Sequence, residues 1–307
     1  MDQGRPRAAV LIGAALLVAA DAPSQLPIRE VRWLAPGIPV ERVNALPPEC
    51  YRPPVDRSER RSAEIGRIAF RAPLLLGGQA ARVGLSCSSC HRNGRNNPDF
   101  HFPGVSGTPG TADVTTSILS SHRGDGTFNP KPIPDLAGEP AKRIVSRDRA
   151  RPDLSKFIHG LITQEFDGPE PPRRVLEGIA AYVRSIAPSN CTGAGSELTA
   201  ASLLGEIDLA LRLARDEPNR PTARLLIGAA RSNLGRIDQR FEVPAVENDR
   251  RLLDEADKDL RSLQDGLGTA AERSLWGKWE RSWPTRRERL EADSPHSLFS
   301  PAVLKQL

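Results

Sequence analysis

The chain has 307 residues, of which 38% are hydrophobic, so it is long enough for about two domains and apolar enough to bury a core. Its net charge is +5, but the positive residues are spread along the chain rather than gathered in a stripe, which argues against a nucleic-acid partner. The one methionine is Met1. A chain that has lost its N-terminus would therefore have no thioether to ligate a metal.

The first 22 residues have the pattern of an export signal. Arg5 and Arg7 precede a run of apolar or small residues from Ala8 to Ala20, and Ala20-Asp21-Ala22 would suit cleavage by signal peptidase. The run is too short to span a bilayer, and no later stretch is long enough either. We expect residues 1–22 to be a signal peptide of a periplasmic or otherwise exported protein without an integral membrane segment. The alternative is a buried N-terminal helix.

The part of the chain that follows is rich in proline and glycine. Residues 23–57 lack a regular period and predict an irregular segment. Helices are expected at three places, residues 58–71, 153–165 and 172–186. Residues 84–140 between them hold many Gly, Pro, Asn and Ser residues, and a loop this long is unusual in a compact domain. We expect it to wrap a large cofactor that replaces a core of side chains.

The C-terminal part has a different pattern, with apolar residues every three or four positions. Four amphipathic segments predict a helical bundle-like domain over residues 196–307, namely 197–215, 221–241, 246–264 and 269–291. Trp276, Trp279 and Trp283 share one face of the last segment, either packed inside the bundle or forming a docking face for a partner. The predicted fold class is therefore mainly α, with a loop-rich domain over residues 58–191 before the bundle.

The motif that carries chemistry is Cys87-Ser88-Ser89-Cys90-His91, a C-x-x-C-H pattern typical of covalent haem attachment. The thiols of Cys87 and Cys90 would form thioethers with the haem vinyl groups, and His91 would be the proximal iron ligand. The alternatives are a thioredoxin-like redox pair, which needs an α/β pattern that this sequence lacks, and a zinc site, which needs two further ligands. A single motif predicts one covalently bound haem c.

Three further segments extend this interpretation. Gly66-Arg67-Ile68-Ala69-Phe70 is similar to the N-terminal helix of a cytochrome c, and Val175 to Ile186, with Tyr182, to its C-terminal helix. Arg123-Gly124-Asp125-Gly126 is similar to a stretch near the distal haem face. With these segments, residues 62–190 resemble the cytochrome c-like domains of the bacterial di-haem cytochrome c peroxidase and MauG group. The resemblance implies a cytochrome c-like haem domain in which the two helices cross at the glycine and the aromatic residues.

The chain departs from that group in three respects. The aromatic residue that precedes Asp-Gly in the group is absent, since Gly124 occupies that place. The peroxidases and MauG use two haems, whereas this chain has one attachment motif. Residues 196–307 match no part of the group. The resemblance therefore implies the fold of one haem domain and not the two-haem chemistry.

The sixth iron ligand is left open, because small cytochromes of this fold often use methionine. His122 precedes the Asp-Gly stretch, where similar domains place a distal methionine, and is the first candidate. His101 lies between two phenylalanines and is the alternative, as a ligand or as a group of the distal pocket. His159, on a predicted helix, and His296, near the C-terminus, are expected to have other roles. The remaining alternative is an open or water-filled position.

The sixth ligand bears on function. Two histidines favour electron transfer, and the preferred interpretation is an electron carrier for a redox partner protein such as another cytochrome. An open site favours a peroxidase-like enzyme, for which His101, Arg123 and Asp125 are the distal candidates. Arg123 could instead pair with a haem propionate. A third hypothesis is a haem-based sensor or assembly subunit in which residues 196–307 carry the function.

Cys50 and Cys191 remain after haem attachment and flank the predicted haem domain. An even number of remaining cysteines in an oxidising compartment predicts a disulfide between them, and two free buried thiols are the alternative. Closing so long a loop has a nominal gain of roughly 5 kcal/mol in the chain-entropy model. The haem cross-link would reduce this gain, because it already restricts the same loop.

Overall fold

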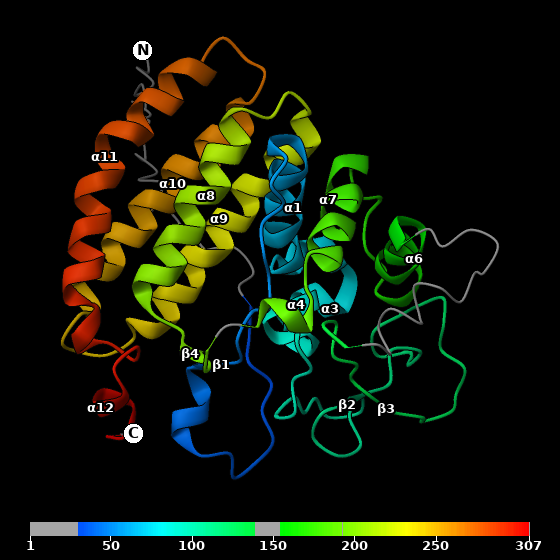
Figure 1. The fold of residues 1–307 in the computed structure, drawn as a ribbon. Helices are drawn as coiled ribbons and strands as arrows, with labels where there is room; N and C mark the ends of the chain where they lie inside the picture. Colours follow the sequence, from blue (N-terminus) through cyan, green and yellow to red (C-terminus); the bar gives the residue numbers. More distant parts are fainter. Residues whose placement is uncertain (1–29, 139–153, 192, 307) are drawn as a thin grey trace, which may run out of the picture.

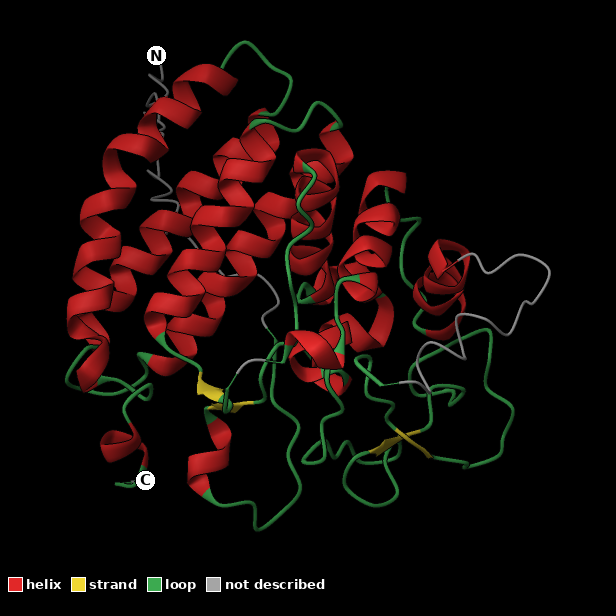
Figure 2. Ribbon diagram, in the orientation of Figure 1, coloured by secondary structure: helices red, strands yellow, loops and turns green. Residues whose placement is uncertain are grey.

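The computed structural model describes residues 30–138, 154–191 and 193–306. The predicted signal peptide at residues 1–22 lies outside the described residues, as do residues 23–29 of the irregular segment and 139–153. The described chain is mainly helical, which confirms the predicted fold class at that level (Figures 1 and 2). The long helices stand side by side, and the longest loops gather beyond α3, α4 and α6 on one side of them (Figure 1).

The first half of the described chain consists of short elements joined by long loops. In chain order they are η1 (Val40–Val43), β1 (Ala45–Leu46), α1 (Arg57–Phe70), α2 (Pro73–Leu76), α3 (Gly78–Arg82), α4 (Cys87–Cys90), η2 (Arg92–Gly94), β2 (Thr111–Ala112), β3 (Lys131–Pro132), α6 (Leu154–Gly160), η3 (Leu161–Glu165), α7 (Arg173–Arg184) and η4 (Pro188–Asn190). Helices α1 and α7 lie where helices are predicted, and α6 continues into the π-helical turn η3 within the predicted range of residues 153–165. Within residues 84–138, the described part of the predicted long loop, the regular elements are the one-turn helices α4 and η2 and the short strands β2 and β3.

Helices α1 and α7 cross at very close range, because each has a glycine at the crossing point. A Cβ atom added to Gly66 would lie 1.9 Å from the carbonyl oxygen of Gly178, and one added to Gly178 would lie 2.8 Å from the carbonyl oxygen of Ser62. One turn further along, the rings of Phe70 and Tyr182 meet edge to face with their centroids 5.3 Å apart. The helices therefore cross at the glycine and the aromatic residues that the sequence singles out.

The second half consists of longer helices joined by short turns. Its elements are β4 (Ser196–Glu197), α8 (Ala200–Arg215), α9 (Arg220–Arg240), η5 (Glu247–Asp249), α10 (Arg250–Gly266), α11 (Glu272–Asp293), η6 (Ser294–His296) and α12 (Pro301–Leu304). The four long helices correspond to the four predicted amphipathic segments. Thr199 caps the N-terminus of α8, since its side chain accepts a hydrogen bond from the backbone N–H of Ser202.

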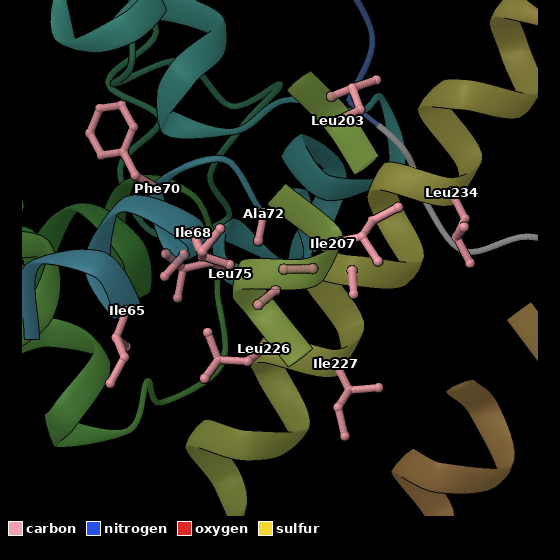
Figure 3. Close-up of a cluster of buried hydrophobic side chains, with 14 of the residues drawn as sticks. Ile65, Ile68, Phe70, Ala72, Leu75, Leu203, Ile207, Leu226, Ile227 and Leu234 are labelled. Carbon is pink, nitrogen blue, oxygen red and sulfur yellow. The ribbon is translucent and has the colours of Figure 1, made fainter. Parts of the chain in front are cut away.

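The hydrophobic core runs without a break from the first half into the second. Figure 3 shows Ile65 and Ile68 of α1 in the same cluster as Ile207 of α8 and Leu226 of α9. None of the helices in the described ranges combines the length and the apolar character needed to cross a membrane.

The three tryptophans of α11 face inward. Trp276, Trp279 and Trp283 are all buried, and the rings of Trp279 and Trp283 stack with centroids 4.6 Å apart. The indole N–H of Trp283 donates a 2.7 Å hydrogen bond to Asp208 of α8. Their role is packing within the bundle rather than forming a docking face.

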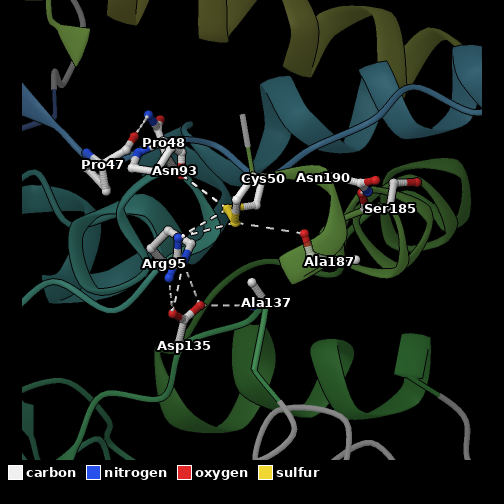
Figure 4. Close-up of a disulfide and its surroundings, with 11 residues drawn as sticks. Pro47, Pro48, Cys50, Asn93, Arg95, Asp135, Ala137, Ser185, Ala187 and Asn190 are labelled. Atoms are coloured by element: carbon white, nitrogen blue, oxygen red, sulfur yellow. Dashed lines mark hydrogen bonds and ion pairs between the residues drawn. A yellow bond between two sulfur atoms is a disulfide. The ribbon is translucent and has the colours of Figure 1, made fainter. Parts of the chain in front are cut away.

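The predicted disulfide between Cys50 and Cys191 is confirmed (Figure 4). Its Cα atoms lie 4.1 Å apart, and 141 residues separate the two cysteines in the chain. The backbone brings the cysteines together, because Tyr51 pairs with Ile186 in an antiparallel bridge and Ala187 N–H donates to the carbonyl of Cys50 at 3.0 Å. The disulfide therefore joins the segment before α1 to the segment after α7.

Candidate haem-binding site

The first half of the structure encloses a large apolar cavity of about 730 Å³. This volume falls within the range of roughly 300–1,000 Å³ that is typical of sites for small molecules and cofactors. Most of the side chains that line the cavity are aliphatic or aromatic, and they come from both the helices and the long loop. They include Phe70, Leu76, Leu85, Phe100, Val105, Leu119, Ile133, Leu136, Leu154, Phe157, Ile158, Ile162, Phe166, Ile179, Val183 and Ile186. The loop thus surrounds a space of the kind that a large apolar cofactor fills.

Cys87, Cys90 and His91 all line this cavity. The local sequence places them there, because α4 is a single helical turn and residues three apart on a helix lie on the same face. Ser86 precedes the turn, and its backbone N–H donates to the hydroxyl of Ser89 at 3.0 Å, which stabilises the start of the helix. The backbone N–H of His91 closes the turn by donating to the carbonyl of Cys87 at 2.9 Å.

The imidazole of His91 is held in one orientation. Its Nδ1 lies 3.0 Å from the carbonyl oxygen of Pro134, and a carbonyl only accepts, so the proton resides on Nδ1 and the lone pair on Nε2. Burial lowers the pKa of His91 to about 4, which keeps the ring neutral at physiological pH. A neutral histidine whose other nitrogen donates to a backbone carbonyl is the usual arrangement for a metal ligand.

The two cysteines of the motif are partly buried, and their thiols are protonated. Burial in the apolar cavity raises the pKa of both Cys87 and Cys90 to about 12. Redox-active C-x-x-C pairs have lowered thiol pKa values instead, since the thiolate is the reactive form. The surroundings of the motif therefore favour haem attachment over the thioredoxin-like alternative.

The candidate sixth ligands lie away from the cavity. All five histidines fall within the described ranges, and His91 is the one that lines it. The side chain of His122 is 58% exposed, with Nε2 3.6 Å from the carboxylate of Asp167. His101 is partly buried beside Phe100, which does line the cavity. His159 lies 2.8 Å from Glu170. Ligation by His122 or His101 thus stays a prediction that would require the side chain to move.

The distal candidates for peroxidase chemistry are not brought together. Asp125 lines the cavity, whereas Arg123 is half-exposed and pairs with Glu165 at 3.3 Å. Two other cations line the cavity, Lys131 of β3 and Arg184 in the last turn of α7. They are better placed than Arg123 to pair with the carboxylates of a haem, and neither was predicted from the sequence.

A chain of polar contacts runs from the disulfide through Arg95 to Asp135 and Ala137 (Figure 4). The guanidinium of Arg95 lies 3.1 Å from the sulfur of Cys50 and 2.8 Å from the carboxylate of Asp135. Asp135 also accepts the backbone N–H of Ala137 at 2.9 Å. Since Asp135 follows Pro134 in the chain, this network holds the carbonyl that orients His91.

Comparison with models of protein families, with curated proteins and with solved structures finds no match to this chain. Within the described ranges, no group of three or more His, Cys, Asp and Glu side chains is placed to hold a metal ion among themselves.

Proposed function

We propose that the protein is a c-type cytochrome that binds one haem covalently through Cys87 and Cys90, with His91 as the proximal ligand. The observation that carries the proposal is the convergence of these three side chains on one apolar cavity, where the carbonyl of Pro134 leaves Nε2 of His91 with its lone pair. When bound, the haem supplies a one-electron redox centre. The chain binds and orients this group and excludes water from it.

The cavity has an exposed edge, and this edge favours electron transfer as the function. Asp125, Asn129 and Lys131 line the cavity and are themselves exposed, and Phe157, also in the lining, is 44% exposed. A cofactor bound there would be separated from a partner protein by few side chains. We therefore propose that the chain carries electrons to or from a redox partner, such as another cytochrome, at this edge.

Export to an oxidising compartment such as the periplasm belongs to the same proposal. Disulfides persist in such compartments, and the disulfide of Cys50 and Cys191 supports this location. The N-terminal pattern of residues 1–22 points the same way.

One observation favours a second candidate function. Neither His122 nor His101 lines the cavity, and the whole sequence has no methionine after Met1. A haem held only by His91 would have an accessible sixth position, as a peroxidase-like enzyme requires. Asp125 is then the one predicted distal group already at the cavity.

Visible spectra of the purified ferric and ferrous protein separate the two functions. Electron transfer predicts a six-coordinate low-spin spectrum that neither carbon monoxide nor peroxide changes. In that case, His122→Ala or His101→Ala should convert it to a high-spin form, which identifies the ligand. A high-spin ferric spectrum with a rapid response to peroxide would overturn electron transfer and support the peroxidase-like function. Absence of any haem absorption would overturn both.

A further inference from the structure

A second cavity, of about 220 Å³, lies on the side of α4 toward the helical bundle. Ser88 and Ser89, the two residues between the haem-attaching cysteines, line it together with Arg92. On the opposite wall are Glu206 of α8 and Arg236 of α9. In contrast to the haem cavity, its walls are rich in charged and polar side chains.

Three of the carboxylates in this cavity are already neutralised by arginines. Glu49 accepts hydrogen bonds from Arg67 and Arg71 at 2.7 and 2.9 Å. Glu206 lies 3.5 Å from Arg71, and Glu30 lies 3.2 Å from Arg236. Glu30 also accepts a 2.5 Å hydrogen bond from the hydroxyl of Ser88. The fourth carboxylate of the lining, Glu197, is exposed, and five arginines face four glutamates, so the cavity keeps a net positive charge.

Two arginines in the same cavity have buried nitrogen atoms with no hydrogen-bond partner. Arg92 is 8% exposed, and its Nη2 finds no acceptor among the residues that the structure describes. Nη2 of Arg32 is buried in the same way, while Nη1 of Arg32 donates to the carbonyl of Val43. Burial lowers the pKa of Arg92 to about 10, so its guanidinium keeps its charge at neutral pH. A buried charge with unmet hydrogen bonds is costly unless an anion accompanies it.

We propose that this cavity binds a small oxyanion, a phosphate or a carboxylate, between the guanidinium groups of Arg92 and Arg32. Both anions present paired oxygens that match the planar fork of an arginine. The volume suits a small anion and not a nucleotide or a peptide. The hydroxyl groups of Ser88 and Ser89 line the same space. This site does not depend on the haem, since it lies on the other side of α4.

Calorimetric titration of the full-length purified protein with inorganic phosphate, and separately with acetate, tests the site. Ionic strength is held constant with chloride in both arms, so that screening does not change. We expect saturable binding of one anion per chain, and the arm that binds more tightly identifies the oxyanion class. Arg92→Gln should weaken this binding about tenfold or more, because it removes a charged hydrogen-bond donor. Arg82→Gln, at an exposed position outside the cavity, is the matched control and should bind as the unchanged protein does.

Two results would overturn the proposal. One is the absence of saturable binding in both arms, together with no rise in melting temperature on adding either anion. The other is an unchanged dissociation constant in Arg92→Gln. If Arg92→Gln does not fold, Arg32→Gln replaces it with the same expected loss, since Arg32 is only partly buried.

Discussion

The two halves of the molecule fill their interiors in different ways. Helices α8 to α11 pack against one another through their own side chains, with leucines, alanines and three tryptophans buried. The first half, around α4, leaves a cavity of about 730 Å³ between short helices and a long loop. An apolar cavity of that size forgoes the packing contacts that stabilise an ordinary core. We therefore expect the stability of the first half to depend more on a bound group and on cross-links than that of the bundle, although one continuous core joins the two halves.

The largest expected effect comes from removing the attachment site. The double variant Cys87→Ala and Cys90→Ala should no longer bind haem covalently. Because the cavity then loses its occupant, amide hydrogen exchange should accelerate by orders of magnitude in α6, α7 and the long loop. The exchange rates in α8 to α11 should change much less. Haem staining of a denaturing gel and hydrogen–deuterium exchange measure the two effects. Equal loss of protection in both halves would show that the halves do not differ in this way.

Removal of the disulfide should have the next largest effect. Cys50→Ser with Cys191→Ser should lower the free energy of unfolding by about 2–5 kcal/mol, because the unfolded chain gains freedom over a loop of 141 residues. Denaturant unfolding, followed by the haem absorption, measures this change. Haem attachment itself should persist. A variant of undiminished stability would show that the haem cross-link alone constrains the first half.

The crossing of α1 and α7 is sensitive to a single methyl group. Gly66→Ala should destabilise the protein by about 3 kcal/mol or more, since the new Cβ would lie 1.9 Å from a backbone oxygen. Gly205→Ala in α8 is the matched control, because no atom lies within 4 Å of its added Cβ. It should be neutral or stabilising by about 0.5–1 kcal/mol. Thermal unfolding of both variants measures the difference, and similar melting temperatures would contradict the close crossing.

Acid should lower the stability of the first half, because it protonates Glu49, the residue before Cys50. Burial raises the pKa of Glu49, but Arg71 and Arg67 outweigh it and hold the pKa at about 2, below the usual 4.5. The carboxylate therefore contributes up to about 3 kcal/mol above pH 5, and this contribution is lost as the pH falls from 5 toward 2. Denaturant unfolding at several pH values should show a smaller acid loss in Glu49→Gln. An equal loss in both proteins would mean that other carboxylates govern acid stability.

Much of the fold could be predicted because amphipathic periodicity is a local property. Helices α8 to α11 lie close to their predicted ranges, since each buries one apolar face along its whole length. The disulfide followed from the count of the remaining cysteines. The close crossing of α1 and α7 at Gly66 also lies where the sequence indicated it, while the resemblance to cytochrome c domains stays a prediction.

The distal side of the site could not be predicted in this way. The long loop has no period that fixes which side chains point inward, so the directions of His122 and Arg123 depend on contacts formed after folding. Asp167 and Glu165, which follow α6, provide those contacts and hold both side chains away from the cavity. The role of Pro134 was equally hidden, because a backbone carbonyl can accept a hydrogen bond whatever residue carries it.

The central claim is that Cys87 and Cys90 carry a haem that His91 ligates. The most direct measurement is mass spectrometry of the proteolytic peptide that contains residues 87–91, from protein expressed together with a cytochrome c maturation system. The account predicts one haem bound covalently to this peptide through both cysteines. The same peptide recovered with two unmodified thiols, from protein whose Cys50–Cys191 disulfide has formed, would contradict it.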